Sequence, residues 1–419
     1  MNVFKFGGAS VKDIGGIKNL ARIVKQFSGE KLVVIISAMG KTTNALEEIL
    51  RLCVVNKSYE NELNAVNTYH FSVMQSLFEK DDIIFNSVEN IITSLNADLK
   101  SGFKNRSKEA FYDSVISKGE ILSTKINQRY LENVGITSMW VDARDFIITD
   151  SLFSEANVDW TKTKNKITSA LPDIVKNKVI VTQGFISGTE DGKTTTLGRE
   201  GSDFSAAIFA ACLDASSVTI WKDVAGILNA DPKLIKDAIK FEQLDYHEAA
   251  EMTYYGATVI HPKTIKPLAN KNIPLYVKSF ENPQAAGTEI NEIHSHKPIP
   301  SFIYKFEQTL LSFGVKDFTF IDEKNLGLIF NAFSDLNITI NLMQTSAISV
   351  SICTNHHAEK LKKLIERLKN HFDIHYNSGL TLITIKNYFY DENSIAHVSI
   401  GKEIILEQKS RHNFQMLVS

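Results

Sequence analysis

The stretch NVFKFGGASVKDIGGIKNLARIVKQFSGEKLVVIISAMG, residues 2–40, decides the fold class of this chain of 419 residues. Its first five residues predict a short strand that runs into two glycines, and residues 31–40 predict a buried strand that ends in a glycine. Between these strands, residues 14–27 carry apolar positions at helical spacing. A strand, a turn, a helix and a second strand in this order are typical of an α/β sheet.

The chain beyond this opening continues to alternate between helical and strand patterns. Residues 44–130 are mostly helical in pattern. Further strands are predicted within four apolar stretches, residues 136–147, 178–188, 216–224 and 273–280. This alternation predicts one layered α-β-α domain over residues 1–288. Residues 289–300 contain prolines and many polar side chains, which are typical of a linker.

The pattern changes after this linker. Strand and helix patterns follow one another in the order β-α-β-β-α-β over residues 301–376, which is the ferredoxin-like arrangement. Ile348, Val350 and Ile352, for example, alternate in a way that predicts a strand. Residues 377–419 show strand patterns without a convincing helix, so we expect them to form a shortened second unit.

The composition excludes several classes of protein. The formal net charge is −2 with acids and bases interspersed, so the chain lacks the basic surface that binds nucleic acids or anionic membranes. No apolar run reaches membrane-spanning length, and the N-terminus lacks a cleavable leader pattern. Cys53, Cys212 and Cys353 lie far apart in apolar stretches, so we expect buried packing residues rather than a disulfide or a zinc site. The remaining expectation is a cytoplasmic protein that binds small molecules.

Two stretches predict an anion site. In KFGGAS, residues 5–10, Lys5 ends a strand and the glycines allow backbone N–H groups to approach an anion closely. In TTTLGREGSDFSAA, residues 194–207, two glycines precede a predicted helix for which Ser202 is the expected N-cap. The free N–H groups at such a helix start attract a phosphate or a carboxylate. The expected apolar stripe of this helix consists of Phe204, Ala207, Ile208, Ala211 and Cys212.

Three further patterns have less specific interpretations. GTEDGKT, residues 188–194, resembles a nucleotide-binding Walker motif but is one residue short between its glycines, so a β-hairpin turn is the better prediction. Glu120 follows a glycine and precedes an apolar helical pattern, which favours an acid that complements a helix dipole. His261 precedes a proline, and we expect a structural turn residue rather than a catalyst.

Eight stretches, taken together and in this order, resemble the aspartate kinases of the amino-acid kinase superfamily. They are KFGGASV, VVIISAMGKTTN, ISKGEILST, VTQGFISG, TTTLGREGSDFSAA, VTIWKDVAGILNADPKLI, YHEAAEMTYYGATVIHPKTI and NPQAAGTEI. They cover essentially residues 1–290, and the β-α-β-β-α-β region is similar to the ACT regulatory domains that follow this kinase domain. The resemblance implies an amino-acid kinase fold, then an ACT domain and a shortened second ACT-like unit.

The resemblance also implies a reaction, in which the γ-phosphoryl group of ATP, accompanied by Mg²⁺, is transferred to the β-carboxylate of L-aspartate. The product would be 4-phospho-L-aspartate, which enters lysine, threonine, methionine and diaminopimelate synthesis. A carboxylate with an ordinary pKa of about 3.9 is ionised at neutral pH, so this reaction needs no general base. It requires two anions to be brought together, which calls for positioning and charge neutralisation.

The functional positions of the family are carried over where the motifs match. The resemblance implies that Lys5 stabilises the transferring phosphoryl group, Arg199 pairs with the substrate carboxylate, and Asp203 orients Lys5 or Mg²⁺. Glu120 would hold the α-ammonium group of the substrate. The other expected substrate residues are Ser37, Thr43 and Ser202. The expected nucleotide residues are Lys5, Gly7, Gly8, Lys222, Asp223, Leu228, Asp231, Lys233, Thr258, Val259 and Lys263. No residue other than Asp203 is expected to contact the metal.

Three departures from the family pattern lie near the expected phosphate site. Glu200 stands where the family commonly has a glycine, and we expect its side chain to point away and to pair with a lysine. Lys222 replaces a common threonine, and Thr258 replaces a common lysine. We hypothesise that Lys222 or Lys263 supplies the missing positive charge.

The regulatory region departs from its relatives as well. Asn341 and Ala347 stand where lysine-sensitive relatives often have acids that could receive a lysine ammonium group. The candidate effector positions are Asn341, Thr345 and Ser346. We therefore expect weak or altered regulation, and a homodimer formed through an exposed edge of the ACT sheet.

Two alternative functions remain open. One is another amino-acid kinase that acts on glutamate, carbamate or a nucleoside monophosphate, although the GREGSD and EMTYYGATVIHP stretches favour aspartate. The other is a non-catalytic amino-acid sensor that has kept the fold. Glu200 and Thr258 favour the sensor, whereas the intact charged residues of the expected substrate and phosphoryl sites argue against it.

Overall fold

The computed structural model describes residues 1–103, 106–257, 260–292, 299–316, 319–390 and 393–419. The chain divides into two compact units. Unit 1 consists of residues 1–227, 240–250 and 259–294. Unit 2 consists of residues 228–239, 251–258 and 295–419.

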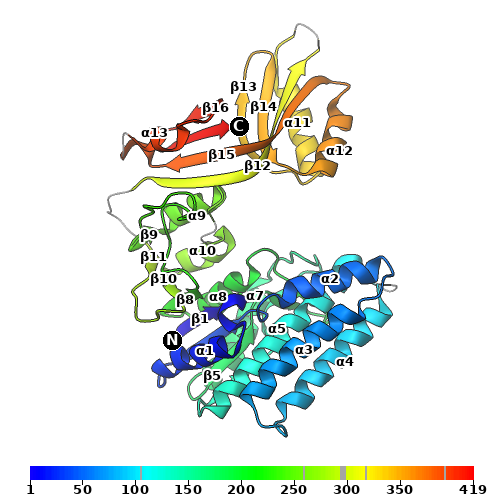
Figure 1. The fold of residues 1–419 in the computed structure, drawn as a ribbon, viewed down its shortest axis with the longest axis vertical. Helices are drawn as coiled ribbons and strands as arrows, with labels where there is room; N and C mark the ends of the chain where they lie inside the picture. The colour runs from blue at the N-terminus through cyan, green and yellow to red at the C-terminus, as the bar shows by residue number, and fades with distance from the viewer. Residues whose placement is uncertain (104–105, 258–259, 293–298, 317–318, 391–392) are drawn as a thin grey trace. The chain divides into compact units, whose positions relative to one another are not determined.

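The centre of unit 1 is an eight-stranded sheet in the order β3-β5-β2-β1-β8-β10-β11-β9 (Figure 1). Its strands are β1 Asn2–Phe6, β2 Leu32–Ile36, β3 Ser138–Trp140, β5 Val179–Gln183, β8 Ser217–Lys222, β9 Gln243–Asp245, β10 Leu275–Ser279 and β11 Thr288–Asn291. Strand β1 pairs in parallel with β2 on one side and with β8 on the other. The carboxyl ends of these three strands therefore lie at one edge of the sheet, where open α/β sheets bind their ligands.

Helices cover both faces of this sheet. The helical elements of unit 1 are η1 Gly8–Val11, α1 Ile14–Gln26, α2 Thr42–Val54, α3 Glu60–Leu77, α4 Ile84–Ser101, α5 Lys108–Asn133, α6 Ala143–Phe146, α7 Trp160–Ile174, α8 Gly201–Cys212 and α10 Pro262–Ala269. Phe4 and Phe6 of β1 pack with Ile17 of α1 and Leu122 of α5 in one core cluster. Because successive side chains of a strand point to opposite faces, the neighbouring residues of β1 face the layer of α8. The predicted α-β-α sandwich is thus confirmed.

A second sheet of unit 1 has the strands β4 Ile148–Thr149, β6 Ile186–Thr189 and β7 Thr194–Thr196. Strands β6 and β7 pair antiparallel, so GTEDGKT forms the predicted hairpin turn. The strand predicted within residues 136–147 is β3, which is short. Strand β3 ends at Trp140, because Asp142 accepts a hydrogen bond from the N–H of Arg144 and caps α6.

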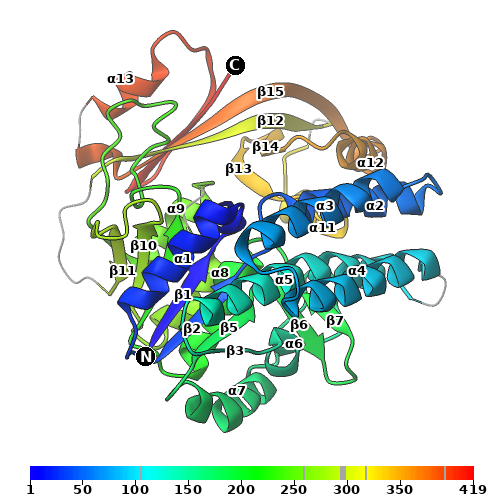
Figure 2. The same ribbon diagram turned by 60° about the horizontal axis from the view of Figure 1, so that its bottom comes forward.

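Unit 2 contains a six-stranded sheet in the order β13-β14-β12-β15-β17-β16. Its elements are β12 Ser301–Val315, α11 Glu323–Asp335, β13 Ile340–Thr345, β14 Ser349–Asn355, α12 Ala358–Leu368, β15 Phe372–Lys386, β16 Ile404–Lys409 and β17 Asn413–Val418. The order from β12 to β15 confirms the predicted β-α-β-β-α-β arrangement. Figure 2 shows the long strands β12 and β15 side by side, and their antiparallel register extends from Ser301 to Val315.

The structure differs from the sequence prediction at the C-terminal region and at the linker. The expectation of strands alone after residue 376 is wrong, since η2 Tyr388–Tyr390 and α13 Ser394–Ser399 lie between β15 and β16. A helix of six residues is too short to show a helical period in the sequence. The predicted division at residue 376 falls within β15, so the two ACT-like parts share one sheet. The predicted linker begins inside β11, and its residues 293–298 lie outside the described residues.

Helix α9 Tyr246–Tyr254 completes the described helices, and every helix of the described residues is too short or too polar to cross a membrane. Cys212 and Cys353 are buried, as predicted. Cys53 is only partly buried, and its thiol donates a hydrogen bond to the carbonyl of Leu99 at 3.6 Å. All three thiols are free.

Candidate active site

The turns that follow β1 and β2 touch each other at the carboxyl edge of the sheet. The N–H of Gly40 donates a hydrogen bond to the carbonyl of Gly8 at 3.0 Å. A Cβ atom at Gly8 would lie 2.4 Å from the carbonyl oxygen of Ala38, whereas one at Gly7 would have room. Only a glycine therefore fits at position 8, where the backbone forms the first turn of η1.

Asp203 forms a buried ionic cluster with two lysines at this edge. Its Oδ1 lies 2.8 Å from Nζ of Lys5, and its Oδ2 lies 3.9 Å from Nζ of Lys222. Burial by itself raises the pKa of Asp203, but the two ammonium groups outweigh this effect and lower it. Asp203 is therefore ionised at neutral pH, and it holds the ends of β1 and β8 together electrostatically.

The start of α8 differs from the prediction. The helix begins at Gly201, so Ser202 is not its N-cap and lies buried in the first turn instead. Glu200, which precedes the helix, has a φ of 54° and makes no side-chain cap. The left-handed backbone of Glu200 turns the chain sharply. Helix α8 therefore begins earlier in the sequence than an N-cap at Ser202 would allow.

Glu200 connects the starts of two helices. Its Oε2 accepts a hydrogen bond from the N–H of His261 at 3.0 Å, so the expected pairing with a lysine is wrong. His261 caps α10 with its ring, because Nδ1 accepts the N–H of Lys263 at 3.2 Å. The prediction of a turn role for His261 is confirmed.

Glu120 is a buried acid in the middle of α5. The interpretation as an acid at a helix start is therefore wrong, because α5 begins at Lys108 and continues through Glu120. The side chain is 3% exposed, and its Oε2 has no hydrogen-bond partner among the described residues. Burial raises the pKa of Glu120 to about 8. An unused buried carboxylate oxygen is suited to a cationic group of a ligand.

The segment after β2 lies next to this part of α5. The hydroxyl of Ser123, which follows Glu120 by one helical turn, donates to the carbonyl of Ser37 at 2.7 Å. Ser37 and Thr43 are both partly buried. The structure thus brings these three expected substrate residues to one region of unit 1.

Arg199 differs from the other expected substrate residues because it is exposed. Within the part of the chain that the structure describes, its guanidinium makes no hydrogen bond or ion pair. It lies two positions before α8 and close enough to His261 to lower the pKa of that imidazole, although burial is the main cause of the shift. The fork of Arg199 is therefore available to a ligand.

The expected nucleotide residues are divided between the two units. In unit 1, Asp223 is exposed directly after β8, and Lys263 forms an ion pair with Glu155. Thr258 and Val259 lie outside the described residues. In unit 2, the segment 228–239 carries Leu228, Asp231 and Lys233.

The segment 228–239 is anchored inside unit 2. Ala230 and Ile235 are buried in a core cluster with residues of the C-terminal strands, Ile383, Ile385, Phe414, Met416 and Val418. The carboxylate of Asp231 accepts the N–H of Lys233 at 2.9 Å, and both side chains are exposed. The sequence placed this segment in the first domain and gave no sign of its packing against the C-terminal strands.

Asp113 is a structural residue that the sequence analysis missed. Its Oδ2 accepts the N–H groups of Ser154 at 2.8 Å and Thr196 at 3.0 Å, and its Oδ1 accepts the hydroxyl of Thr196 at 2.8 Å. The residue is fully buried on α5, seven positions before Glu120 and hence on the same helical face. This spacing of seven residues was the feature of the sequence that could have revealed Asp113. Asp113 fixes the strand β7 that leads to Arg199.

Of the candidate effector positions in unit 2, Thr345 and Ser346 are exposed, whereas Asn341 is already saturated. The Nδ2 of Asn341 donates to Gln308 at 2.7 Å and to Asn355 at 2.9 Å, and its Oδ1 accepts from Lys305 at 3.0 Å. Asn341 therefore has little capacity left to bind an effector ammonium group. Among the described residues, no group of three or more His, Cys, Asp or Glu side chains could hold a metal ion.

Comparisons with known proteins show the family to which this chain belongs. The sequence profile of the Amino acid kinase family matches residues 1–279. The chain is 31% identical to lysine-sensitive aspartokinase 3 of Escherichia coli over 352 residues, which is 84% of this chain and 77% of that protein. It is 30% identical to bifunctional aspartokinase/homoserine dehydrogenase 2 of Arabidopsis thaliana over 393 residues, which is 90% of this chain but 42% of that protein.

The fold agrees with a solved structure along the whole chain. The crystal structure of E. coli aspartokinase III in complex with aspartate and ADP superposes with a TM-score of 0.85 at 27% sequence identity, and the match covers 100% of this chain and 96% of that one. The sequence match and the structural match both extend beyond the kinase-like unit into the C-terminal sheet. The chain therefore belongs to the amino acid kinase family, and within that family to the aspartokinases.

Proposed function

We propose that this chain transfers the γ-phosphoryl group of ATP to the β-carboxylate of L-aspartate, which yields 4-phospho-L-aspartate for lysine, threonine and methionine synthesis. The observation that carries this proposal is the buried Oε2 of Glu120, which is unpartnered among the described residues beside the segment after β2. A buried acid of this kind suits the α-ammonium group of an amino acid. The E. coli relative of known structure, which was solved with aspartate and ADP, supports this assignment.

Each charged residue has a distinct proposed role. Arg199 pairs with a carboxylate of aspartate through two parallel hydrogen bonds, while Ser37, Thr43 and Ser202 contribute hydroxyl groups to the pocket. Lys5 neutralises the charge that develops on the transferring phosphoryl group. Asp203 holds Lys5 in place through the 2.8 Å ion pair. Asp203 is thus a positioning residue.

The reaction requires positioning rather than proton transfer. An oxygen of the β-carboxylate forms a bond to the γ-phosphorus while the bond from that phosphorus to the β,γ-bridging oxygen breaks, and ADP departs with the electron pair. The nucleophile is ionised without a base, so the barrier comes from the approach of two anions. The positive groups of Lys5 and Lys222, together with the N–H groups around Gly7 and Gly8, lower that barrier.

We propose that the nucleotide binds through these groups together with Asp223, Leu228, Asp231, Lys233, Thr258, Val259 and Lys263. Mg²⁺ would enter with the nucleotide, held mainly by phosphate oxygens. Asp203 is a poor direct ligand for this ion, because its two oxygens already face Lys5 and Lys222.

We further propose a cytoplasmic homodimer joined through the ACT-like sheet, with weak feedback control. The saturated amide of Asn341 supports weak control by lysine. Millimolar lysine or threonine should leave most of the kinase activity intact in a steady-state assay. Complete inhibition by either amino acid would contradict this expectation.

The experiment that tests the activity is ATP-dependent formation of an acyl phosphate trapped with hydroxylamine. Aspartate and glutamate are compared as substrates, and Lys5→Ala is the inactive control. We expect a product with aspartate that is lost in the variant. Product with glutamate alone would indicate another amino-acid kinase. No product with either substrate, together with measurable binding of aspartate, would favour the non-catalytic sensor.

A further inference from the structure

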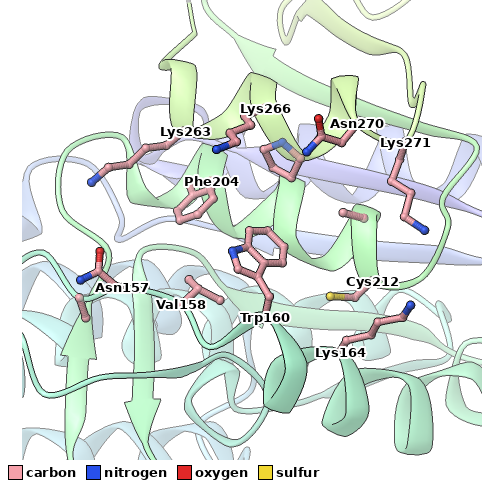
Figure 3. A pocket seen from close by; sticks show the side chains of 13 residues that line it. Asn157, Val158, Trp160, Lys164, Phe204, Cys212, Lys263, Lys266, Asn270 and Lys271 are labelled. Atoms are coloured by element: carbon pink, nitrogen blue, oxygen red, sulfur yellow. The ribbon is translucent and has the colours of Figure 1, made fainter.

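A groove in unit 1 lies between the helices α7, α8 and α10 (Figure 3). Its volume is about 690 Å³. The lining residues are Ala156, Asn157, Val158, Trp160, Lys164, Phe204, Ala211, Cys212, Lys263, Lys266, Pro267, Asn270 and Lys271. A groove of this size matches the volume of a small organic ligand.

One side of the groove is aromatic and apolar. Trp160 is 42% exposed although it is among the largest apolar side chains. Its ring lies 6.2 Å from that of Phe204 at an interplanar angle of 65°, and Figure 3 shows the two rings next to each other in the groove. Phe204 and Cys212 belong to the apolar stripe of α8, so part of that stripe lines the groove. This wall provides a preformed surface for a planar apolar group.

Positively charged side chains also line the groove. Among the residues that the structure describes, four lysines and no Asp or Glu line the groove. Lys263 and Lys271 form ion pairs with Glu155 and Asp214, which do not line the groove. Among the described residues, the ammonium groups of Lys164 and Lys266 make no ion pair or hydrogen bond. The groove therefore has an uncompensated positive charge next to an apolar wall.

The lysines are distributed along the whole groove. Figure 3 shows Lys263 at one end, and Lys164 and Lys271 near the thiol of Cys212 at the other. Burial raises the pKa of Cys212 to about 11, although the same two ammonium groups act in the opposite direction. A ligand on the apolar wall would thus meet a positive group wherever its acidic end lies.

We propose that this groove is a binding site for a small organic anion that combines a planar apolar body with a carboxylate, phosphate or sulfonate group. The body would stack on Trp160 and Phe204, and the acidic group would pair with Lys164 and Lys266. Lys263 is the one lining residue that is also among the proposed nucleotide contacts. The site otherwise uses residues with no role in the proposed reaction.

A ligand in this groove would contact the helix that carries the reaction's charged cluster. Phe204 directly follows Asp203, which pairs with Lys5. A bound ligand would therefore contact the first turn of α8, next to Asp203. This contact makes the groove a candidate effector site of the kinase unit.

The first experiment uses 8-anilino-1-naphthalenesulfonate, which is a planar apolar sulfonate, with the full-length chain. We expect one saturable site per chain, seen as dye fluorescence and as quenching of tryptophan emission that is reduced in Trp160→Phe, which keeps Trp140 and Trp221. The uncharged analogue N-phenyl-1-naphthylamine should bind more weakly. Competition with 1-naphthoate and with 1-naphthyl phosphate then separates a preference for carboxylates from one for phosphates.

Matched lysine variants decide the outcome. Lys164→Gln combined with Lys266→Gln should weaken the binding of the sulfonate roughly three- to tenfold, as expected for two partly solvated ion pairs. Lys166→Gln combined with Lys178→Gln removes the same charge from exposed positions of unit 1 that do not line the groove, and it should have no effect. ADP should not displace the dye. Equal binding by both double variants, or stoichiometric displacement by ADP, would overturn the proposal.

Discussion

At the scale of single residues, Glu120 shows how burial changes the properties of a side chain in the proposed aspartate pocket. The residue is 3% exposed, and burial raises the pKa of its carboxyl group to about 8 from an ordinary value of 4.5. Without a ligand, the group is therefore largely protonated at neutral pH. An ammonium group placed beside it would favour the ionised form, so substrate binding and the ionisation of Glu120 are linked.

This linkage predicts how stability depends on pH. The folded chain binds the Glu120 proton more tightly than the unfolded chain, so the free energy of unfolding should fall as the pH rises from about 4.5 to about 8. The decrease approaches roughly 1.4 kcal/mol per pH unit within that window. Glu120→Gln removes the titrating group, so its unfolding in urea should depend less on pH than that of the wild type. Parallel pH profiles of the two proteins would contradict the prediction.

Glu200 departs from the expected family pattern, and its backbone conformation carries a structural cost. Its φ of 54° lies in the left-handed region, which favours the glycine that the resemblance leads us to expect at this position. The chain keeps a glutamate there, and the carboxylate gains the hydrogen bond from the N–H of His261. The backbone strain thus lowers the stability of the folded chain, whereas the hydrogen bond raises it.

Two substitutions separate these effects. Glu200→Ala keeps the strain and loses the hydrogen bond, so we expect a loss of about 1–2 kcal/mol in the free energy of unfolding. Glu200→Gly loses the hydrogen bond but relieves the strain, so it should stay within about 1 kcal/mol of the wild type. Urea unfolding measures both. Equal destabilisation by the two variants would mean that the left-handed backbone carries no cost.

Helix α5 shows how one element organises a region at the next scale. Its face carries Asp113 and Glu120 seven residues apart, and each acid serves a different partner. Asp113 accepts three hydrogen bonds from Ser154 and Thr196, while Glu120 keeps an oxygen for a ligand. Helix α5 therefore fixes the strand β7 and borders the proposed aspartate pocket at the same time.

The clamp on β7 gives a prediction at the scale of elements. Asp113→Ala removes the acceptor of two backbone N–H groups and of the Thr196 hydroxyl, so it should reduce the free energy of unfolding by roughly 2–4 kcal/mol. It should also raise the KM for aspartate, because β7 leads directly to Arg199. Glu109→Gln, an exposed change in the first turn of the same helix, is the control. A destabilised variant with an unchanged KM would show that β7 does not position Arg199.

The whole molecule is built from two units that do not follow the order of the sequence. The segment 228–239, which carries three proposed nucleotide residues, groups with the C-terminal sheet in unit 2. Ile235 anchors it among Ile383, Phe414 and Met416. The proposed nucleotide contacts of this segment therefore depend on how well the C-terminal strands are packed.

Ile235→Ala tests this dependence. The lost packing should cost about 2–4 kcal/mol locally and should raise the KM for ATP, while kcat at saturating ATP changes less. Ile329→Ala is the matched control, because it empties a buried site in the cluster around α11 and α12 of the same unit. It should lower stability without a comparable change in the KM for ATP. Equal effects of both variants on this KM would indicate general loosening of unit 2.

The sequence by itself determined the order of elements and the residue types of the site. Periods of two and 3.6 residues are local, so the layered sheet, the hairpin at GTEDGKT and the β-α-β-β-α-β region could be predicted. The glycines after β1 and before α8 could be predicted as an anion site for the same reason. Short elements such as α13 could not, because six residues do not establish a period.

Only the tertiary structure decided which of these residues meet and what surrounds them. The ion pair of Lys5 with Asp203, the clamp of Asp113 and the anchoring of Ile235 all join residues distant in the sequence. Glu120 was misinterpreted for a related reason, since burial is a property of the whole fold and not of the neighbouring residues. Charges, pKa shifts and unpartnered atoms depend on distance through space, and the sequence pattern encodes only distance along the chain.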